Sequence, residues 1–207
     1  MKKVILTSMM FYSIYGFSQD FKFGVKGGLN VASQNITVQD NEGISTSLKN
    51  VIGINIGFFG QFKVSEKFYL QPELFYSMQG QALEIVFDGQ TALLTQEVNY
   101  IVLPVIAKYY TGKKFSIQAG PQLGLLVAAT KKADSSIPWL PSSSEEAKSN
   151  YNSTDFGLNF GLGYDFFKNV SLATRYYIGL SDAKKIVSEE SSASKNRVFS
   201  IGVEYKF

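Results

Sequence analysis

The 207-residue sequence contains no cysteine and no histidine. Without cysteine there is no disulfide, no thiolate ligand or nucleophile, and no N-terminal cysteine for a lipoprotein anchor. Without histidine the usual general base and metal ligand near neutral pH is missing. We therefore predict no enzyme, no cofactor, and no catalytic, cofactor-binding or metal-binding residue.

Charged residues are scarce, at 18% of the chain, against roughly 25% in an ordinary soluble domain. The formal net charge of +3 is no electrostatic footprint for a nucleic-acid partner. Proline is rare (5 residues), whereas glycine is frequent (18 residues) and 45% of the residues are hydrophobic. No later stretch approaches the ~20 continuous apolar residues of a membrane helix. A chain of this kind enters a membrane only as a closed sheet.

The first residues have the layout of a secretory signal peptide. Met1-Lys2-Lys3 is a basic start, residues 4–15 are mostly apolar, and Gly16-Phe17-Ser18 places small residues at positions −3 and −1. We expect residues 1–18 to be cleaved and residues 19–207 to form one domain beyond the inner membrane.

From residue 21 onward, large apolar residues alternate with small or polar ones, which is typical of β-strands. In residues 155–166, for example, Phe, Leu and Tyr alternate with Gly, Asn and Asp. Each such stretch is long enough to cross hydrocarbon when tilted. The pattern predicts eight strands, at residues 21–32, 51–63, 68–79, 98–110, 114–128, 155–166, 170–181 and 198–207.

The expected connections alternate between long loops and short turns. Short periplasmic turns and long outer loops are typical of outer-membrane barrels. Pro104 cannot donate to a ladder, so we expect a bulge or local break there. The prediction is an all-β, eight-stranded antiparallel up-and-down transmembrane β-barrel, with both termini periplasmic. The long loops are expected at residues 33–50, 80–96, 129–150 and 182–196, and the turns at 64–67, 111–113 and 168–169.

Volume and charge place the bulky apolar face toward lipid. A small barrel has no interior room for several Phe, Leu or Tyr side chains per strand. On all expected strands except 98–110 the bulky face carries no charge, as lipid requires, because Lys or Arg at the midplane costs roughly 2–4 kcal/mol. In strand 98–110 both faces are apolar, and we assign Pro104, Ile106 and Lys108 inward.

The last strand ends at the terminus in Tyr205-Lys206-Phe207. Aromatic residues at the last and third-last positions resemble the C-terminal signal that hands outer-membrane barrels to their insertion machinery. We expect Tyr205 and Phe207 to be this assembly signal, with the insertion machinery and outer-membrane lipid as partners. The expected location is the outer membrane of a Gram-negative-type cell. The alternative is the closing strand of a soluble sheet.

Four segments together resemble the PorT-like outer-membrane β-barrel family. The resemblance covers essentially the whole chain after residue 18 and implies an eight-stranded outer-membrane barrel. The family's eponym participates in protein secretion across the outer membrane, and carrying that role over rests on analogy of fold. The segments are Gly24-Val25-Lys26-Gly27-Gly28-Leu29-Asn30, Leu70-Gln71-Pro72-Glu73-Leu74-Phe75-Tyr76-Ser77, Leu103-Pro104-Val105-Ile106-Ala107-Lys108-Tyr109-Tyr110 and Ala119-Gly120-Pro121-Gln122-Leu123-Gly124.

Charged residues on the predicted inner face are expected to pair as a structural network, because unpaired buried charge is costly. We expect Glu73 and Glu204 to neutralise Lys26 and Arg175. An ion or proton path is the functional alternative, although a filled small barrel is not a pore. The network residues are Lys26, Glu73, Lys108, Arg175 and Glu204.

Two further features were weighed as sites. Asp155 and Asp165 share a strand face but lie ten residues apart, too far to act as a carboxylate pair, so we interpret them as polar lining of the interior. Residues 137–141 contain the only tryptophan, and an exposed apolar cluster can contact a partner. Trp139 and Leu140 are the candidate contact loop; alternatively, this loop folds onto its own barrel rim.

The expected function is that of a non-catalytic structural or interaction component of the outer membrane, with another outer-membrane protein as candidate partner. It could include a role accessory to secretion or assembly machinery. The alternative is a barrel that transports or binds a small solute or amphiphile.

Overall fold

The computed structural model describes residues 21–34, 45–137, 140–184 and 194–207. The predicted signal peptide, residues 1–18, lies outside this range. Helical structure in the described ranges is limited to one short 3₁₀ turn, and no helix there could cross a bilayer. The elements are β1 (Phe21–Gln34), β2 (Ser45–Lys63), β3 (Phe68–Phe87), β4 (Gln90–Tyr110), β5 (Phe115–Ser135), β6 (Ser143–Glu146), η1 (Lys148–Asn150), β7 (Thr154–Asp165), β8 (Val170–Gly179) and β9 (Asn196–Lys206).

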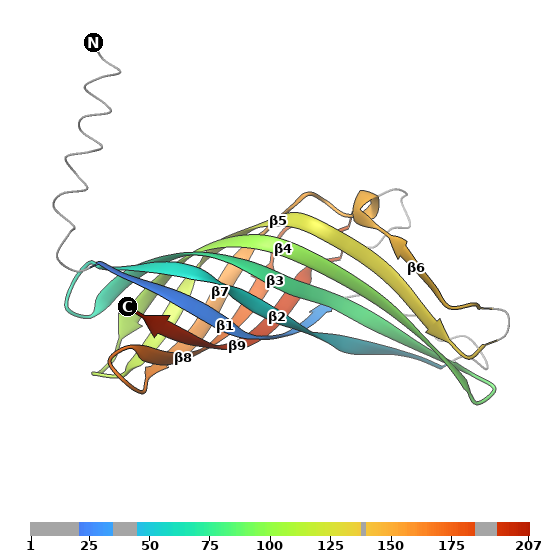
Figure 1. Ribbon diagram of the computed structural model, residues 1–207, viewed down its shortest axis with the longest axis horizontal. Coiled ribbons are helices and arrows are strands. Elements are labelled where there is room, and N and C mark those ends of the chain that lie inside the picture. Colours follow the sequence, from blue (N-terminus) through green and yellow to red (C-terminus); the bar gives the residue numbers. More distant parts are fainter. Residues whose placement is uncertain (1–20, 35–44, 138–139, 185–193) are drawn as a thin grey trace, which may run out of the picture.

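The strands close into a ring (Figure 1). Around the ring the order is β1-β2-β3-β4-β5-β7-β8-β9, and β9 pairs back with β1. All pairs are antiparallel, and β6 adds to β5 outside the ring. Closure removes the sheet edges that would otherwise expose unpaired backbone groups. The predicted eight-stranded antiparallel barrel is confirmed.

The barrel wall has the two faces that the alternation predicts. Large apolar side chains point outward around the circumference; Ile52, Phe160 and Val203, from three different strands, are 73%, 49% and 50% exposed. The inward positions carry mainly polar or small residues, most of them buried. An apolar belt of this extent needs a lipid covering, because soluble monomers rarely expose large apolar patches.

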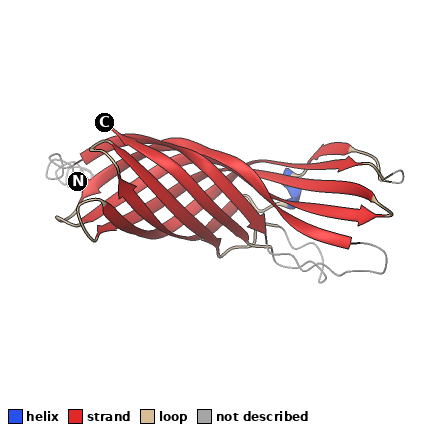
Figure 2. Ribbon diagram, turned by 90° about the horizontal axis from the view of Figure 1, so that it is seen from below, coloured by secondary structure: helices blue, strands red, loops and turns tan. Residues whose placement is uncertain are grey.

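At one end, β3, β4 and β5 continue well beyond the ring (Figure 2). With the start of β2 and with β6 they form a protruding sheet in the order β2-β3-β4-β5-β6. We call this part the long-strand end. The opposite end has the short turns, and both the described start of β1 and the C-terminus lie there, since Phe21 pairs with Phe62 and Phe207 N–H donates to Phe23 O.

The outward face changes from apolar to largely polar in the protruding sheet. The outward face of β4 changes from Leu103 and Ile101 in the barrel to Asn99, Glu97 and Thr95 beyond it. Ion pairs lie on this outward face, with Lys132 Nζ 2.7 Å from Glu97 Oε1 and Lys49 Nζ 3.1 Å from Glu84 Oε2. The inward Ala92 and Val98 are fully buried. A change of this kind is expected where lipid gives way to water.

The expected loop over residues 80–96 is wrong. β3 and β4 run on as one hairpin and turn at Asp88-Gly89, whose φ angles are +47° and +72°. Positive φ at both positions belongs to a type I′ turn, for which Asp-Gly is a favoured pair. The sequence therefore held a hairpin signal inside the stretch that we expected to be a loop. Likewise β2 begins at Ser45, β5 ends at Ser135, and β6 lies in the expected 129–150 loop.

Of the expected bulge or local break at Pro104, the bulge is wrong, whereas the β3–β4 pairing is interrupted at Leu103 and Pro104. The β3–β4 register is the same on both sides of it, with Pro72 opposite Val105 and Phe75 opposite Val102. The register irregularity between β4 and β5 lies instead between Asn99 and Tyr100. Pro104, Ile106 and Lys108 all point inward and are buried. The face assignment for this strand is therefore confirmed. A ladder bonded on both sides tolerates one missing N–H donor without a change of register.

Candidate functional site

Five interior charged side chains meet inside the barrel, and each comes from a different strand. All five are at most 5% exposed at the side chain. They are Lys26 on β1, Glu73 on β3, Lys108 on β4, Arg175 on β8 and Glu204 on β9. The alternation directs each of them inward, because each lies on the face opposite the lipid-facing residues of its strand.

Two of the ion pairs cross the full width of the lumen. Arg175 Nη1 lies 2.7 Å from Glu73 Oε2, and Lys108 Nζ lies 2.6 Å from Glu204 Oε2. Around the ring, β8 is separated from β3 by three strands on either side, and the same holds for β9 and β4. Each pair therefore joins opposite walls. Arg175 Nη2 also contacts Glu204 Oε1 at 3.1 Å and links the two struts.

Lys26 is the most weakly bound member of the network. Its Nζ lies 3.5 Å from Glu73 Oε2 and 5.0 Å from the centre of the Phe75 ring. The expected partners differ in part: Glu73 contacts both Lys26 and Arg175, whereas Glu204 contacts Lys108 and Arg175. Three cations face two carboxylates, so the network carries a formal charge of +1.

Sequence reasoning missed the amides that complete the network. Gln71 Nε2 donates to Glu73 Oε1 at 2.7 Å and to Glu204 Oε1 at 3.2 Å. Gln61 donates to Gln71, and Arg175 Nε donates to Gln118 Oε1 at 2.9 Å. Gln71 stands two residues before Glu73 on the same face, and this i, i+2 spacing was the available signal. Hydrogen bonds of this kind are what allow charges to remain buried.

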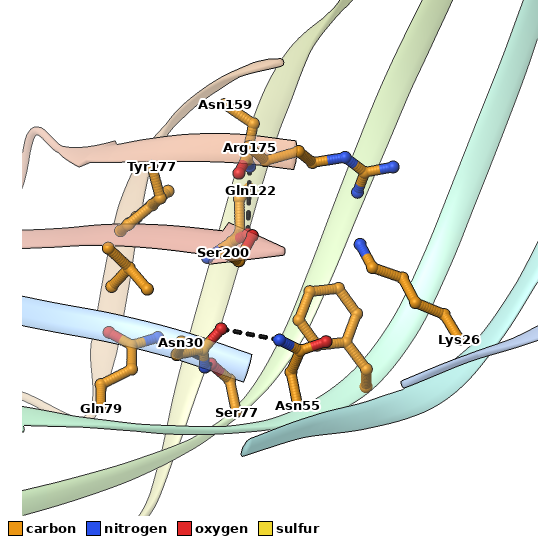
Figure 3. A pocket seen from close by; sticks show the side chains of 12 residues that line it. Lys26, Asn30, Asn55, Ser77, Gln79, Gln122, Asn159, Arg175, Tyr177 and Ser200 are labelled. Atoms are coloured by element: carbon orange, nitrogen blue, oxygen red, sulfur yellow. Dashed lines mark hydrogen bonds between the residues drawn. The ribbon is translucent and has the colours of Figure 1, made fainter. Parts of the chain in front are cut away.

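Next to the charged network lies a layer of short amides and hydroxyls (Figure 3). Asn55 Nδ2 donates to Asn30 Oδ1 at 2.7 Å, and Asn30 Nδ2 donates to Ser77 Oγ at 3.0 Å. Across the lumen, Asn159 Nδ2 donates to Gln122 Oε1 at 3.0 Å. These groups surround a cavity of only about 20 Å³, the space of a single water molecule.

Toward the long-strand end, an apolar cluster packs inside the barrel. It consists of Val98, Tyr100, Val102, Ala129, Ala147 and Tyr151, with Phe75 and Leu126 packed against it. The Tyr151 hydroxyl donates to Gln96 Oε1 at 2.7 Å, and burial raises the pKa of Tyr151 to about 12. The tyrosine is thus a neutral hydrogen-bond donor well above neutral pH. We call this cluster the apolar seal.

The two aspartates lie in separate clusters, as expected for polar lining. Asp155 accepts hydrogen bonds from Tyr177, Ser181 and Asn196 at 2.9–3.0 Å. Asp165 accepts from the Ser171 hydroxyl at 2.6 Å and pairs with Lys206 at 3.2 Å. No group of three or more carboxylates that could hold a metal occurs within the described ranges.

Trp139 of the candidate contact loop lies outside the described residues, so its role stays a prediction. Leu140 is half-buried, and its N–H donates to Ile137 O at 3.1 Å. Ile137 is buried, which agrees with a loop folded onto its own barrel. At the other end, Tyr205 and Phe207 point outward, 43% and 67% exposed, with ring centroids 5.3 Å apart. Their role in assembly stays a prediction.

Solved structures similar to this chain are outer-membrane barrels. The attachment invasion locus protein Ail of Yersinia pestis shares 13% identity, with 91% of this chain and 100% of that chain covered, at a TM-score of 0.50. The outer membrane protease OmpT of Escherichia coli shares 9% identity, with 91% and 95% covered, at 0.51. Outer Membrane Protein W of E. coli shares 12% identity, with 92% and 100% covered, at 0.42. At these identities the likeness to Ail and to OmpT shows the fold alone.

A comparison with curated proteins gave no match. The family model described as the outer membrane protein beta-barrel domain matches residues 17–185, which is most of the chain. This match agrees with the apolar belt and the closed ring, and it places the protein in the outer membrane of a Gram-negative cell. The chain belongs to the outer membrane protein β-barrel domain family.

Proposed function

We propose that this protein is a non-catalytic structural or interaction component of the outer membrane, in which a closed barrel anchors a folded sheet that protrudes into water. The observation that carries the proposal is the filled interior. Two ion-pair struts join opposite walls, and the apolar seal lies above them. A lumen filled in this way supports a rigid anchor and not a passage.

The orientation follows from the lengths of the connections. Outer-membrane barrels keep their short turns in the periplasm and their longer segments outside. Both the described start of β1 and Phe207 lie at the short-turn end. We therefore infer that both termini are periplasmic and that the sheet β2-β3-β4-β5-β6 extends outside the cell.

The proposal of no catalysis rests on the residue types that the chain lacks. It contains no histidine and no cysteine, and the five charged groups of the central network are engaged in ion pairs. The likeness to OmpT is 9% in identity and transfers no protease activity, because function resides in sites and not in folds.

A role accessory to secretion is the finer form of this proposal. The segments that resemble the PorT-like family contribute inward side chains, among them Lys26, Gln71, Glu73, Lys108 and Gln122, to the polar interior. They therefore support likeness in barrel architecture. Co-purification of the tagged protein with large outer-membrane partners would favour the secretion role. Trp139→Ser should weaken such co-purification if the contact loop takes part.

Conductance in planar bilayers tests the filled-barrel proposal. The purified, folded protein is expected to give no discrete conductance steps under conditions in which a water-filled porin gives them. The alternative of solute transport needs a passage through the lumen wider than the cavity of about 20 Å³. Stepwise conductance, or swelling of liposomes in a small sugar, would overturn the proposal and favour transport.

A further inference from the structure

A recess of about 440 Å³ opens at the short-turn end of the barrel. Its size is within the range of small-molecule sites. Lysine is the commonest residue in its lining: Lys22, Lys67, Lys113, Lys168 and Lys206, beside two acidic residues, Glu66 and Asp165.

The lysines reach the recess from separate elements. Lys67 lies in the β2–β3 turn, Lys113 in the β4–β5 turn and Lys168 in the β7–β8 turn. Each of the three turns at the short-turn end thus supplies one lysine to the lining of the recess. Lys22 comes from β1, on the same inward face as Lys26. We call Lys22, Lys67, Lys113 and Lys168 the rim lysines.

Asp165 does not neutralise the rim lysines, because other groups already engage it. Lys206 Nζ lies 3.2 Å from its Oδ1, the Ser171 hydroxyl donates to the same oxygen at 2.6 Å, and the Tyr110 hydroxyl donates to Oδ2 at 3.1 Å. The Tyr110 ring packs edge-on against Tyr69, with centroids 5.2 Å apart. These contacts fix the positions of Asp165, Lys206, Tyr110 and Tyr69, which line the recess.

The rim lysines have an excess of positive charge. Within the described ranges, none of their ammonium groups lies within 4.0 Å of a carboxylate, in contrast to Lys49 and Lys132 at the long-strand end. Glu66 is the one acidic lining residue besides Asp165. Four like charges around a recess repel one another, and an anion placed between them relieves that repulsion.

We propose that this recess binds a ligand carrying two or more phosphate or carboxylate groups, held by the ammonium groups of the rim lysines. Lysine suits this role because it acts as a flexible point charge with three donors. The inference does not depend on which side of the membrane this end faces, nor on the proposed function. Soluble polyanions and anionic lipid headgroups share the chemistry, and the test separates them.

The test is a calorimetric titration of the full chain, folded in zwitterionic micelles, with sodium tripolyphosphate. We expect saturable binding. The affinity should fall as the salt concentration rises from roughly 0.05 to 0.2 M, because salt screens the charges. The triple variant Lys67→Gln/Lys113→Gln/Lys168→Gln should bind at least about tenfold more weakly, because three of the four charges are lost. The matched control Lys49→Gln/Lys131→Gln/Lys148→Gln changes the net charge equally at the other end and should bind within about twofold of wild type.

Glu66→Gln provides a test that a folding defect cannot imitate. Removal of this carboxylate should tighten tripolyphosphate binding by about twofold or more, because it leaves the rim more positive.

Nanodiscs separate the two sources of anion. Competition by anionic lipid assigns the site to headgroups, and undiminished binding assigns it to a soluble polyanion. The proposal is overturned if wild type shows no saturable binding or if both triple variants lose affinity equally.

Discussion

Two substitutions in the interior network should differ sharply in effect, although each removes one charge. Glu204→Gln leaves three cations facing one carboxylate and deprives Lys108 of its 2.6 Å partner. Lys26→Met leaves two cations facing two carboxylates and removes only the 3.5 Å contact to Glu73. The net charge of the network therefore rises from +1 to +2 in the first variant and falls to zero in the second.

The expected magnitudes follow from burial. Removal of one partner from a buried pair costs about 3–5 kcal/mol, because an uncompensated charge remains buried. Glu204 is fully buried, so Glu204→Gln should lower the free energy of unfolding by that amount. Lys26→Met replaces an ammonium group by a thioether next to Phe75, and it should change stability by less than about 1 kcal/mol.

Urea unfolding in micelles measures both variants, with the transition followed by far-UV circular dichroism of the strands and by mobility on unheated gels. The double variant is the internal control. It restores a network charge of +1 and should be more stable than Glu204→Gln alone. The reasoning is refuted if Lys26→Met is as destabilising as Glu204→Gln, or if the double variant loses the sum of both effects.

Three other predictions test the barrel outside the network. Leu103→Arg on the lipid face should cost about 2–4 kcal/mol, whereas Thr91→Arg on the outward face of the protruding sheet should be nearly neutral; equal costs in urea unfolding would contradict the assigned membrane level. Gly89→Val should raise protease cleavage at the β3–β4 tip, because valine at positive φ is strained by about 1–2 kcal/mol. Gly112→Val, at a turn glycine with equal open space and no left-handed φ, should not. Phe207→Ser should lower the amount of folded barrel in cells severalfold yet change the stability of the refolded protein by less than about 1 kcal/mol, because the ring is 67% exposed; equal folded amounts would remove the assembly signal.

Face assignment succeeded because it depends on local alternation alone. A side chain two residues from another on a strand shares its face whatever the strand pairs with. Phe160 and Ile52 were therefore placed outward, and Lys108 and Glu204 inward, without knowledge of any partner strand. Even strand 98–110, with apolar residues on both faces, followed from the single charge of Lys108.

The prediction of strand length was wrong where the surroundings of the sheet change from lipid to water. The expected strands ended where the outward face ceased to be apolar, as at Gln79. Beyond that level β3 and β4 continue in water, where an outward Glu97 paired with Lys132 is as acceptable as a leucine is in lipid. The Asp88-Gly89 turn was the local evidence for a hairpin, and the search for a lipid-facing pattern passed over it.

From its residue pattern alone, this chain specifies a closed antiparallel barrel with lipid outside and charges inside. Alternation, charge placement and the lack of helical spans act through neighbouring residues, so they can be read along one strand. Which inward residues meet one another cannot be read along one strand. Lys108 and Glu204 lie 96 residues apart in sequence, and the stagger of all eight strands sets whether their side chains reach the same height. Tertiary closure therefore determines which charges pair, where the lumen is sealed, and how the lysines of separate turns surround one recess.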